Sequence, residues 1–164
     1  MKAINEQYSS AACFKKFSTF LDHNNLRKTP ERLAILNCIL KINSLFTVDQ
    51  LFQLIDETDY HVSRATLYNT IELLSKCGII RRHVFEGLPP QYERISASPR
   101  SFAICSNCGR IKDIRDNNFI AFMNAHKKIT AFTMSHYSLY IYGICNTCAR
   151  KLKRSNNANM KKTK

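Results

Sequence analysis

The 164-residue chain lacks several features, and each absence excludes a class of protein. It has no apolar run of about 18 residues, so we expect no transmembrane helix. Acidic residues are scarce, with 12 Asp and Glu against 25 Lys and Arg. The net charge of +13 favours a polyanionic partner, most often nucleic acid. A soluble basic protein with a solvated tail is the alternative that charge alone leaves open.

Targeting and catalytic signals are also missing. The N-terminal segment has no continuous apolar core like that of a signal peptide, so we expect a cytoplasmic protein. Thiols stay reduced there, and seven cysteines therefore indicate metal or thiol chemistry rather than a disulfide framework. The chain has no Gly-rich phosphate loop and no His/Asp/Ser constellation, so we do not expect an enzyme.

Residues 1–95 predict a winged helix-turn-helix domain. Residues 8–22 are amphipathic at helical spacing. Residues that commonly cap helices precede three further apolar segments, at Thr29, Thr47 and Ser63. Residues 79–85 and 91–95 then resemble two short strands joined by a turn-rich tip. The helix before this hairpin is the one expected to enter a DNA groove.

The rest of the chain predicts a hinge, a second small domain and a tail, which makes the whole protein α+β. Residues 96–100 resemble a hinge. A small α/β domain over 101–150 is predicted from one helix and three strands, at 119–126, 102–105, 110–114 and 137–144. Residues 151–164 are basic and have little to bury, so we expect a disordered tail.

Two C-x-x-C pairs, Cys105/Cys108 and Cys145/Cys148, carry the most specific chemical signal. Each pair can present two thiolates from a tight turn, and together they form the tetrahedral set that zinc prefers. The 36 residues between the pairs must fold back on themselves. We expect one structural zinc ion, with disulfides, a redox pair or an iron–sulfur cluster as alternatives. The remaining cysteines, Cys13, Cys38 and Cys77, suit the inner faces of helices.

Over roughly residues 10–150, the chain resembles the ferric uptake regulator family. The matching segments are Arg27–Leu36, Ser63–Thr70, Arg82–Gly87, Tyr92-Glu93, Cys105–Gly109 and Tyr142–Cys148. This resemblance implies a homodimeric, metal-responsive transcription regulator, usually a repressor. Its winged helix would bind A·T-rich palindromic operators, its second domain would dimerise, and the four cysteines would hold structural zinc. The iron-responsive branch is the most similar.

Several residues are candidates for DNA contacts. On the fourth helix, Tyr68 can pack on thymine methyls and Asn69 can pair with adenine. Asn69 replaces the Arg that usually follows this Tyr in the family. Arg27 aligns with a position that reaches the minor groove. The other candidates, which suit phosphates or share the exposed face of that helix, are Ser63, Arg64, Thr66, Arg81 and Arg82.

The family's regulatory metal site is degenerate in this sequence. Histidine positions of that site are occupied by Leu45, Arg100 and Phe102, while its carboxylates remain as Glu93 and Asp113. Positions of a neighbouring site fall on Pro99, Ser101, Ile120 and Tyr137. Carboxylates without imidazoles bind Fe²⁺ or Zn²⁺ poorly. An ion pair between Arg100 and Glu93 could replace the metal as a clamp.

Three alternatives stay open at this point. A regulatory site for Fe²⁺, Mn²⁺ or Zn²⁺ could be rebuilt from Glu93, Asp113, His136 and His83. A regulator of the same fold could sense haem or thiol redox instead, using Cys13, Cys38 or Cys77. A zinc-ribbon module that binds protein or RNA is the candidate from another functional class.

Overall fold

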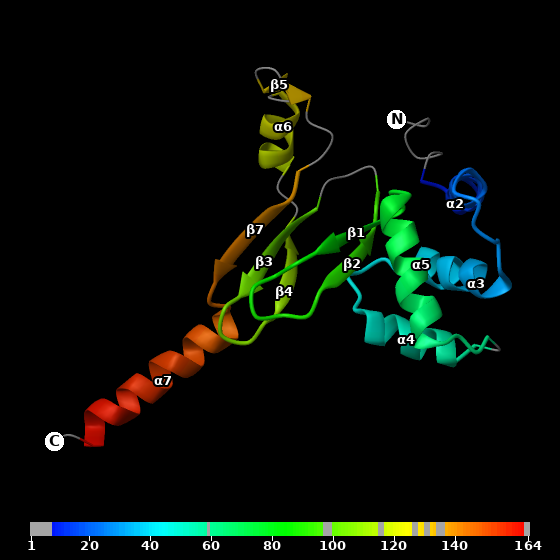
Figure 1. Cartoon of the computed structure of the whole chain (residues 1–164). Helices are drawn as coiled ribbons and strands as arrows, with labels where there is room; N and C mark the ends of the chain where they lie inside the picture. The colour runs from blue at the N-terminus through cyan, green and yellow to red at the C-terminus, as the bar shows by residue number, and fades with distance from the viewer. Residues whose placement is uncertain are drawn as a thin grey trace. The chain divides into compact units, whose positions relative to one another are not determined.

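The computed structural model describes residues 8–58, 60–96, 100–114, 117–125, 128–129, 132–133 and 137–162. The chain divides into two compact units, residues 1–97 and 98–164. Elements are labelled as in Figure 1. Every helix in the described ranges is too short or too polar to span a bilayer.

The described residues of the first unit form four helices and a hairpin (Figure 1). The helices are α2 (Ser10–His23), α3 (Pro30–Lys41), α4 (Val48–Asp56) and α5 (Arg64–Lys76). Each begins after a hydroxyl side chain that accepts a backbone N–H of its first turn, from Ser9, Thr29, Thr47 and Ser63. These caps satisfy N–H groups that have no partner within the helix. The helix starts predicted at Thr29, Thr47 and Ser63 are confirmed.

The core of the first unit lies between these helices. Phe17 and Leu21 of α2 are fully buried, as are Ile35 of α3, Leu51 of α4 and Leu67 of α5. Each helix therefore presents an apolar stripe to a shared interior, and burying one such side chain contributes about 1.5–3 kcal/mol. This core fixes which face of α5 remains exposed.

The hairpin consists of β1 (Ile80–His83) and β2 (Gln91–Arg94), paired antiparallel. It follows α5 directly, because Gly78 turns the chain at a φ of +68° that other residues rarely adopt. Phe46, just before α4, bridges to Tyr92 of β2. The four helices and this paired hairpin form the predicted winged helix-turn-helix.

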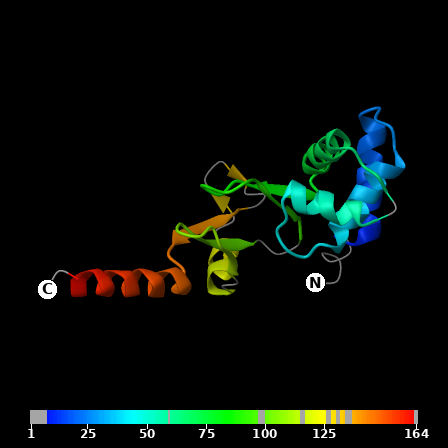
Figure 2. The same cartoon turned by 90° about the horizontal axis from the view of Figure 1, so that it is seen from below.

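The second unit is built on a three-stranded sheet of order β4-β3-β7 (Figure 2). Its strands are β3 (Ser101–Cys105), β4 (Ile111–Ile114) and β7 (Leu139–Gly143). The pair β3–β4 is antiparallel and β3–β7 is parallel. A parallel pair needs a long connection, and this one contains α6 (Asn117–Ala125), β5 (Lys128–Ile129) and β6 (Phe132–Thr133).

The prediction of a disordered tail is wrong for most of its length. Helix α7 runs from Asn146 to Lys162 and so includes nearly all of residues 151–164. Its first turn contains Cys148, and the Ala149 N–H donates to the Cys145 carbonyl oxygen at 2.9 Å. The cysteine pair thus starts a helix, and propagation costs much less than nucleation. The composition of residues 151–164 alone did not reveal this helix start.

Candidate functional site

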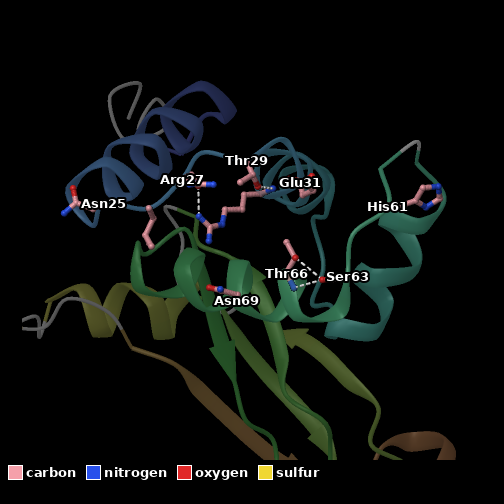
Figure 3. A pocket seen from close by; sticks show the side chains of 10 residues that line it. Asn25, Arg27, Thr29, Glu31, His61, Ser63, Thr66 and Asn69 are labelled. Carbon is pink, nitrogen blue, oxygen red and sulfur yellow. Dashed lines mark hydrogen bonds between the residues drawn. The ribbon is translucent and has the colours of Figure 1, made fainter.

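A groove of 690 Å³ lies in the first unit between the start of α5 and the segment that leads into α3. Figure 3 shows Ser63, Thr66 and Asn69 on the α5 side, with Arg27, Thr29 and Glu31 opposite. The groove brings together four predicted DNA-binding residues: Arg27, Ser63, Thr66 and Asn69. Its lining combines helix-capping hydroxyls with two arginines, Arg27 and Arg32, and one carboxylate, Glu31. The hydroxyls and the arginines suit contacts to phosphate oxygens.

Two groove residues were missed in the sequence. Arg32 is half-buried and donates from Nη1 to the Arg27 carbonyl oxygen at 2.6 Å. This bond joins α3 to the segment that precedes it, and both line the groove. His61 lies two residues before the Ser63 cap and lines the other end of the groove. In the sequence, Arg32 lies three residues after the Thr29 cap and His61 lies two residues before the Ser63 cap. Their positions beside predicted helix starts were the signal that could have found them.

Helix α5 separates a buried face from an exposed one. Leu67, Ile71 and Leu74 are buried in the core. Tyr68 keeps 52% of its surface exposed, and Asn69 is also exposed. An exposed aromatic side chain beside an exposed amide can reach base edges without disturbing the core.

Arg64 is exposed but already has partners within the first unit. Its Nη1 lies 2.9 Å from Asp49 Oδ1 of α4. Its guanidinium carbon lies 4.7 Å from the centre of the Phe52 ring. The Asp49 hydrogen bond also raises the pKa of Arg64. Arg64 thus fastens α5 to α4, and a DNA contact by this residue would have to compete with that ion pair.

The two wing arginines differ. Arg82 is exposed on β1, whereas Arg81 is half-buried with Nη1 3.5 Å from Glu93 Oε1. The same carboxylate oxygen lies 3.0 Å from Nε2 of the buried His83. Of the two, Arg82 is therefore the better candidate for a phosphate contact.

The metal centre of the second unit is a cluster of the four predicted cysteines. The sulfur atoms of Cys105, Cys108, Cys145 and Cys148 all lie within 4.8 Å of one another. All seven cysteines belong to the described part of the chain, and none forms a disulfide. Cys105 ends β3, and Gly109 turns the chain after Cys108 at a φ of +69°. Four converging sulfur donors fit tetrahedral zinc, so this cluster is a structural zinc site.

The thiols of this cluster differ in pKa. The Cys145 N–H donates to Cys105 Sγ at 3.3 Å, and this bond is the main cause that lowers the pKa of Cys105 to about 6. The Arg110 N–H lowers the pKa of Cys108, but the thiols of Cys105 and Cys148 raise it, to about 11 overall. Neighbouring thiolates repel each other, and a bound cation removes that repulsion.

The other cysteines have surroundings that oppose redox sensing. Burial is the main cause that raises the pKa of Cys13, Cys38 and Cys77. The thiolate is the reactive form of cysteine, so a raised pKa lowers reactivity. Cys13 and Cys77 are buried in the core, and Cys38 packs against it, as predicted for core-filling residues.

The regulatory metal that the resemblance implies does not fit the described residues. Glu93 is buried against Arg81 and His83. In the second unit, Arg100 Nε and Nη2 donate to Asp113 Oδ2 at 3.1 and 2.7 Å. Basic side chains of the protein thus lie against both carboxylates. Among the described residues, the four cysteines are the one group of three or more metal ligands. His136 and Pro99 lie outside the described residues, as does the side chain of Ile120.

Comparisons with known proteins agree with this architecture. The sequence profile described as "Ferric uptake regulator family" matches residues 23–142. The peroxide operon regulator of Bacillus subtilis is 28% identical over 131 residues, covering 80% of this chain and 90% of that protein. The peroxide-responsive repressor PerR of Staphylococcus saprophyticus is 27% identical over 133 residues, covering 81% and 89%.

Solved structures share the fold. The ferric uptake regulator of Helicobacter pylori matches with a TM-score of 0.71 at 16% identity, covering 86% of this chain and 94% of that chain. The ferric uptake regulator of Pseudomonas aeruginosa with manganese matches with a TM-score of 0.67 at 18% identity, covering 79% and 97%. The relatives include both peroxide-responsive and ferric uptake regulators, so the predicted iron-responsive branch stays a prediction. The profile runs from His23, the last residue of α2, to Tyr142 in β7, which is more than half of the chain, and the chain belongs to the ferric uptake regulator family.

Proposed function

We propose that this chain is a homodimeric, sequence-specific DNA-binding repressor of transcription. The observation that carries the proposal is the exposed side of α5, where Asn69 lines the groove and the adjacent Tyr68 is exposed, while the opposite side fills the core. A winged helix-turn-helix places such a helix in the major groove of DNA. The proposal assigns the chain no catalytic activity and a cytoplasmic location.

In this proposal, the contacts divide into base reading and positioning. Tyr68 packs on thymine methyls and Asn69 pairs with adenine, which favours A·T-rich operators. Arg27 enters a narrow minor groove, and Arg82 neutralises a phosphate on the wing. Ser63 and Thr66 present their hydroxyls and the first N–H groups of α5 to the backbone. Two copies related by a two-fold axis then read the two halves of a palindrome.

The zinc site has a structural role in this proposal. Zinc held by four thiolates has no open position for a substrate, so it stabilises the second unit rather than catalysing a reaction. We infer that this unit forms the dimer interface. Relatives named for peroxide and metal responses suggest a signal-dependent regulator. The arginines against these carboxylates, Arg81 beside Glu93 and Arg100 beside Asp113, argue that the signal does not enter through a metal bound there.

Replacing Tyr68 by Ala tests the base-reading role. Because a specific base contact is worth about 1–3 kcal/mol, we expect operator affinity to fall about 5- to 150-fold. Affinity for random DNA should change less than about twofold, because that binding depends on phosphates. Operator fragments selected from random pools would be compared with scrambled duplexes by fluorescence anisotropy.

Tyr60→Ala is the matched control, because Tyr60 is 48% exposed but lies outside α5. It should leave both affinities unchanged. Equal losses on operator and random DNA for Tyr68→Ala would refute base reading by this residue. Failure of the unmodified chain to prefer any selected duplex would overturn the proposed function itself.

A further inference from the structure

The positive charge of this protein lies mainly outside the winged helix. The first unit has 12 Lys and Arg against 10 Asp and Glu, a net charge of +2. The second unit has 13 against two, a net charge of +11. The winged helix therefore supplies little of the long-range attraction that a polyanion would feel.

Helix α7 concentrates this excess. Arg150, Lys151, Lys153 and Arg154 lie within five consecutive residues, and all four are exposed. The helix contains no acidic residue over its 17 positions. In the part of the chain that the structure describes, these four cations form no ion pair, whereas Lys28, Arg64 and Lys76 of the first unit each pair with a carboxylate.

The four cations share one side of α7. At 3.6 residues per turn, Arg150 and Arg154 lie nearly above one another, with Lys151 and Lys153 flanking them. Leu152 falls on the opposite side. Like charges at these spacings repel and destabilise a helix unless an anion lies against them. A cationic face of this kind is stabilised by binding a polyanion.

The zinc site fixes the start of the helix that carries this basic face. The Ala149 N–H donates to the Cys145 carbonyl oxygen in the first turn, and two zinc ligands bracket that turn. From there α7 runs away from the sheet of its own unit in both views (Figures 1 and 2). The basic face thus begins next to the four-cysteine zinc site and extends away from the sheet.

We propose that the basic face of α7, formed by Arg150, Lys151, Lys153 and Arg154, binds the phosphate backbone of duplex DNA. Four charges over a rise of about 6 Å give one charge per about 1.5 Å. Duplex DNA carries one negative charge per about 1.7 Å of its axis when both strands are counted, and one per about 3.4 Å on each strand, so the cationic face is at least as densely charged as the backbone that it would meet. This contact rests on the proposed function and adds sequence-independent affinity to the base reading of α5.

The test is the salt dependence of DNA binding by the full zinc-loaded chain. Each lost phosphate contact reduces the slope of log K against log salt by about 0.9. We expect the variant R150Q/K151Q/K153Q/R154Q to lose about two to four units of slope and to bind operator and random DNA more weakly by similar factors. Glutamine preserves helix propensity, and zinc content with circular dichroism would verify folding.

Two control variants sharpen this test. Lys15→Gln/Lys41→Gln removes exposed charges from α2 and α3 and should leave the slope unchanged. Arg150→Lys/Arg154→Lys keeps the charge and should keep the slope. An unchanged slope in the quadruple variant overturns the α7 contact even when operator preference persists. A loss confined to RNA or anionic vesicles, with DNA binding intact, overturns the choice of partner.

Discussion

The two units of this chain are stabilised in different ways. Among its described residues, the first unit buries a core of 20 side chains, and several of its cations pair with carboxylates. Among the described residues of the second unit, few side chains are buried, Phe102 and Ile104 being two of them, and four thiols gather at one corner. Where few side chains are buried, as in this described part, a metal site is an additional source of stability. The hydrophobic effect thus stabilises the winged helix, whereas zinc adds stability to the second unit.

Removing a zinc ligand should have the largest effect. Structural zinc supplies an apparent ~10–16 kcal/mol in small domains, so Cys108→Ser should release zinc and unfold the second unit. Cys108 is exposed, so the substitution leaves no core cavity. Elemental analysis and calorimetry would measure the loss, with Cys38→Ser as the control that retains zinc. Stoichiometric zinc in Cys108→Ser would contradict the difference between the units.

Lowering the pH should weaken zinc binding at the same four cysteines. The folded pKa of Cys105, lowered to about 6, lies below the usual thiol value of 9.0. A lowered pKa stabilises the folded state at high pH, and this stabilisation is lost as the pH falls through about 6. Zinc also competes with protons for thiolates. Zinc affinity, measured by chelator competition, should therefore fall steadily from about pH 8 to about pH 5, and a flat profile would contradict this pH dependence.

A core substitution should affect the first unit alone. Leu67 is fully buried among the helices, and Leu67→Ala should cost about 2–5 kcal/mol. The first unit would then melt earlier while zinc stays bound. Leu54→Ala on the exposed side of α4 is the control and should change stability little. Zinc release by Leu67→Ala would show that the units do not unfold separately.

Metal titration should find metal bound at the four cysteines and none bound at Glu93 or Asp113. Because Arg81, His83 and Arg100 lie against the two carboxylates, we expect one zinc per chain after anaerobic dialysis with Fe²⁺ or Mn²⁺. Elemental analysis would count the metal. A second, exchangeable metal would mean that a site is rebuilt, and substitutions of Glu93, Asp113 and His136 would then locate it.

The two wing arginines should give the smallest effects. Arg82→Ala removes an exposed charge, so it should flatten the salt slope of DNA binding by about 0.9. Arg81→Ala removes a partner of the buried Glu93 and should lower the melting temperature of the first unit instead. Equal effects of the two variants on the salt slope would contradict the inference that Arg82 contacts DNA while Arg81 stabilises the first unit.

Much of the fold could be predicted from local signals. Thr29, Thr47 and Ser63 cap helices where they precede an apolar stripe, because the cap bonds join residues three apart. The zinc ligands were equally predictable, since each C-x-x-C pair is local and zinc needs four such donors. The α7 helix was not predicted, because its composition opposes burial and its start depends on the cysteine corner.

The sequence alone determined the helix starts, the hairpin, the four zinc ligands and the excess of positive charge. Only the tertiary structure decided which charges are paired. Arg64 meets Asp49 across 15 positions of sequence, and Arg100 meets Asp113 across 13. A capping bond or a C-x-x-C turn is fixed by neighbours along the chain, whereas these ion pairs form because packed helices and paired strands bring distant residues together.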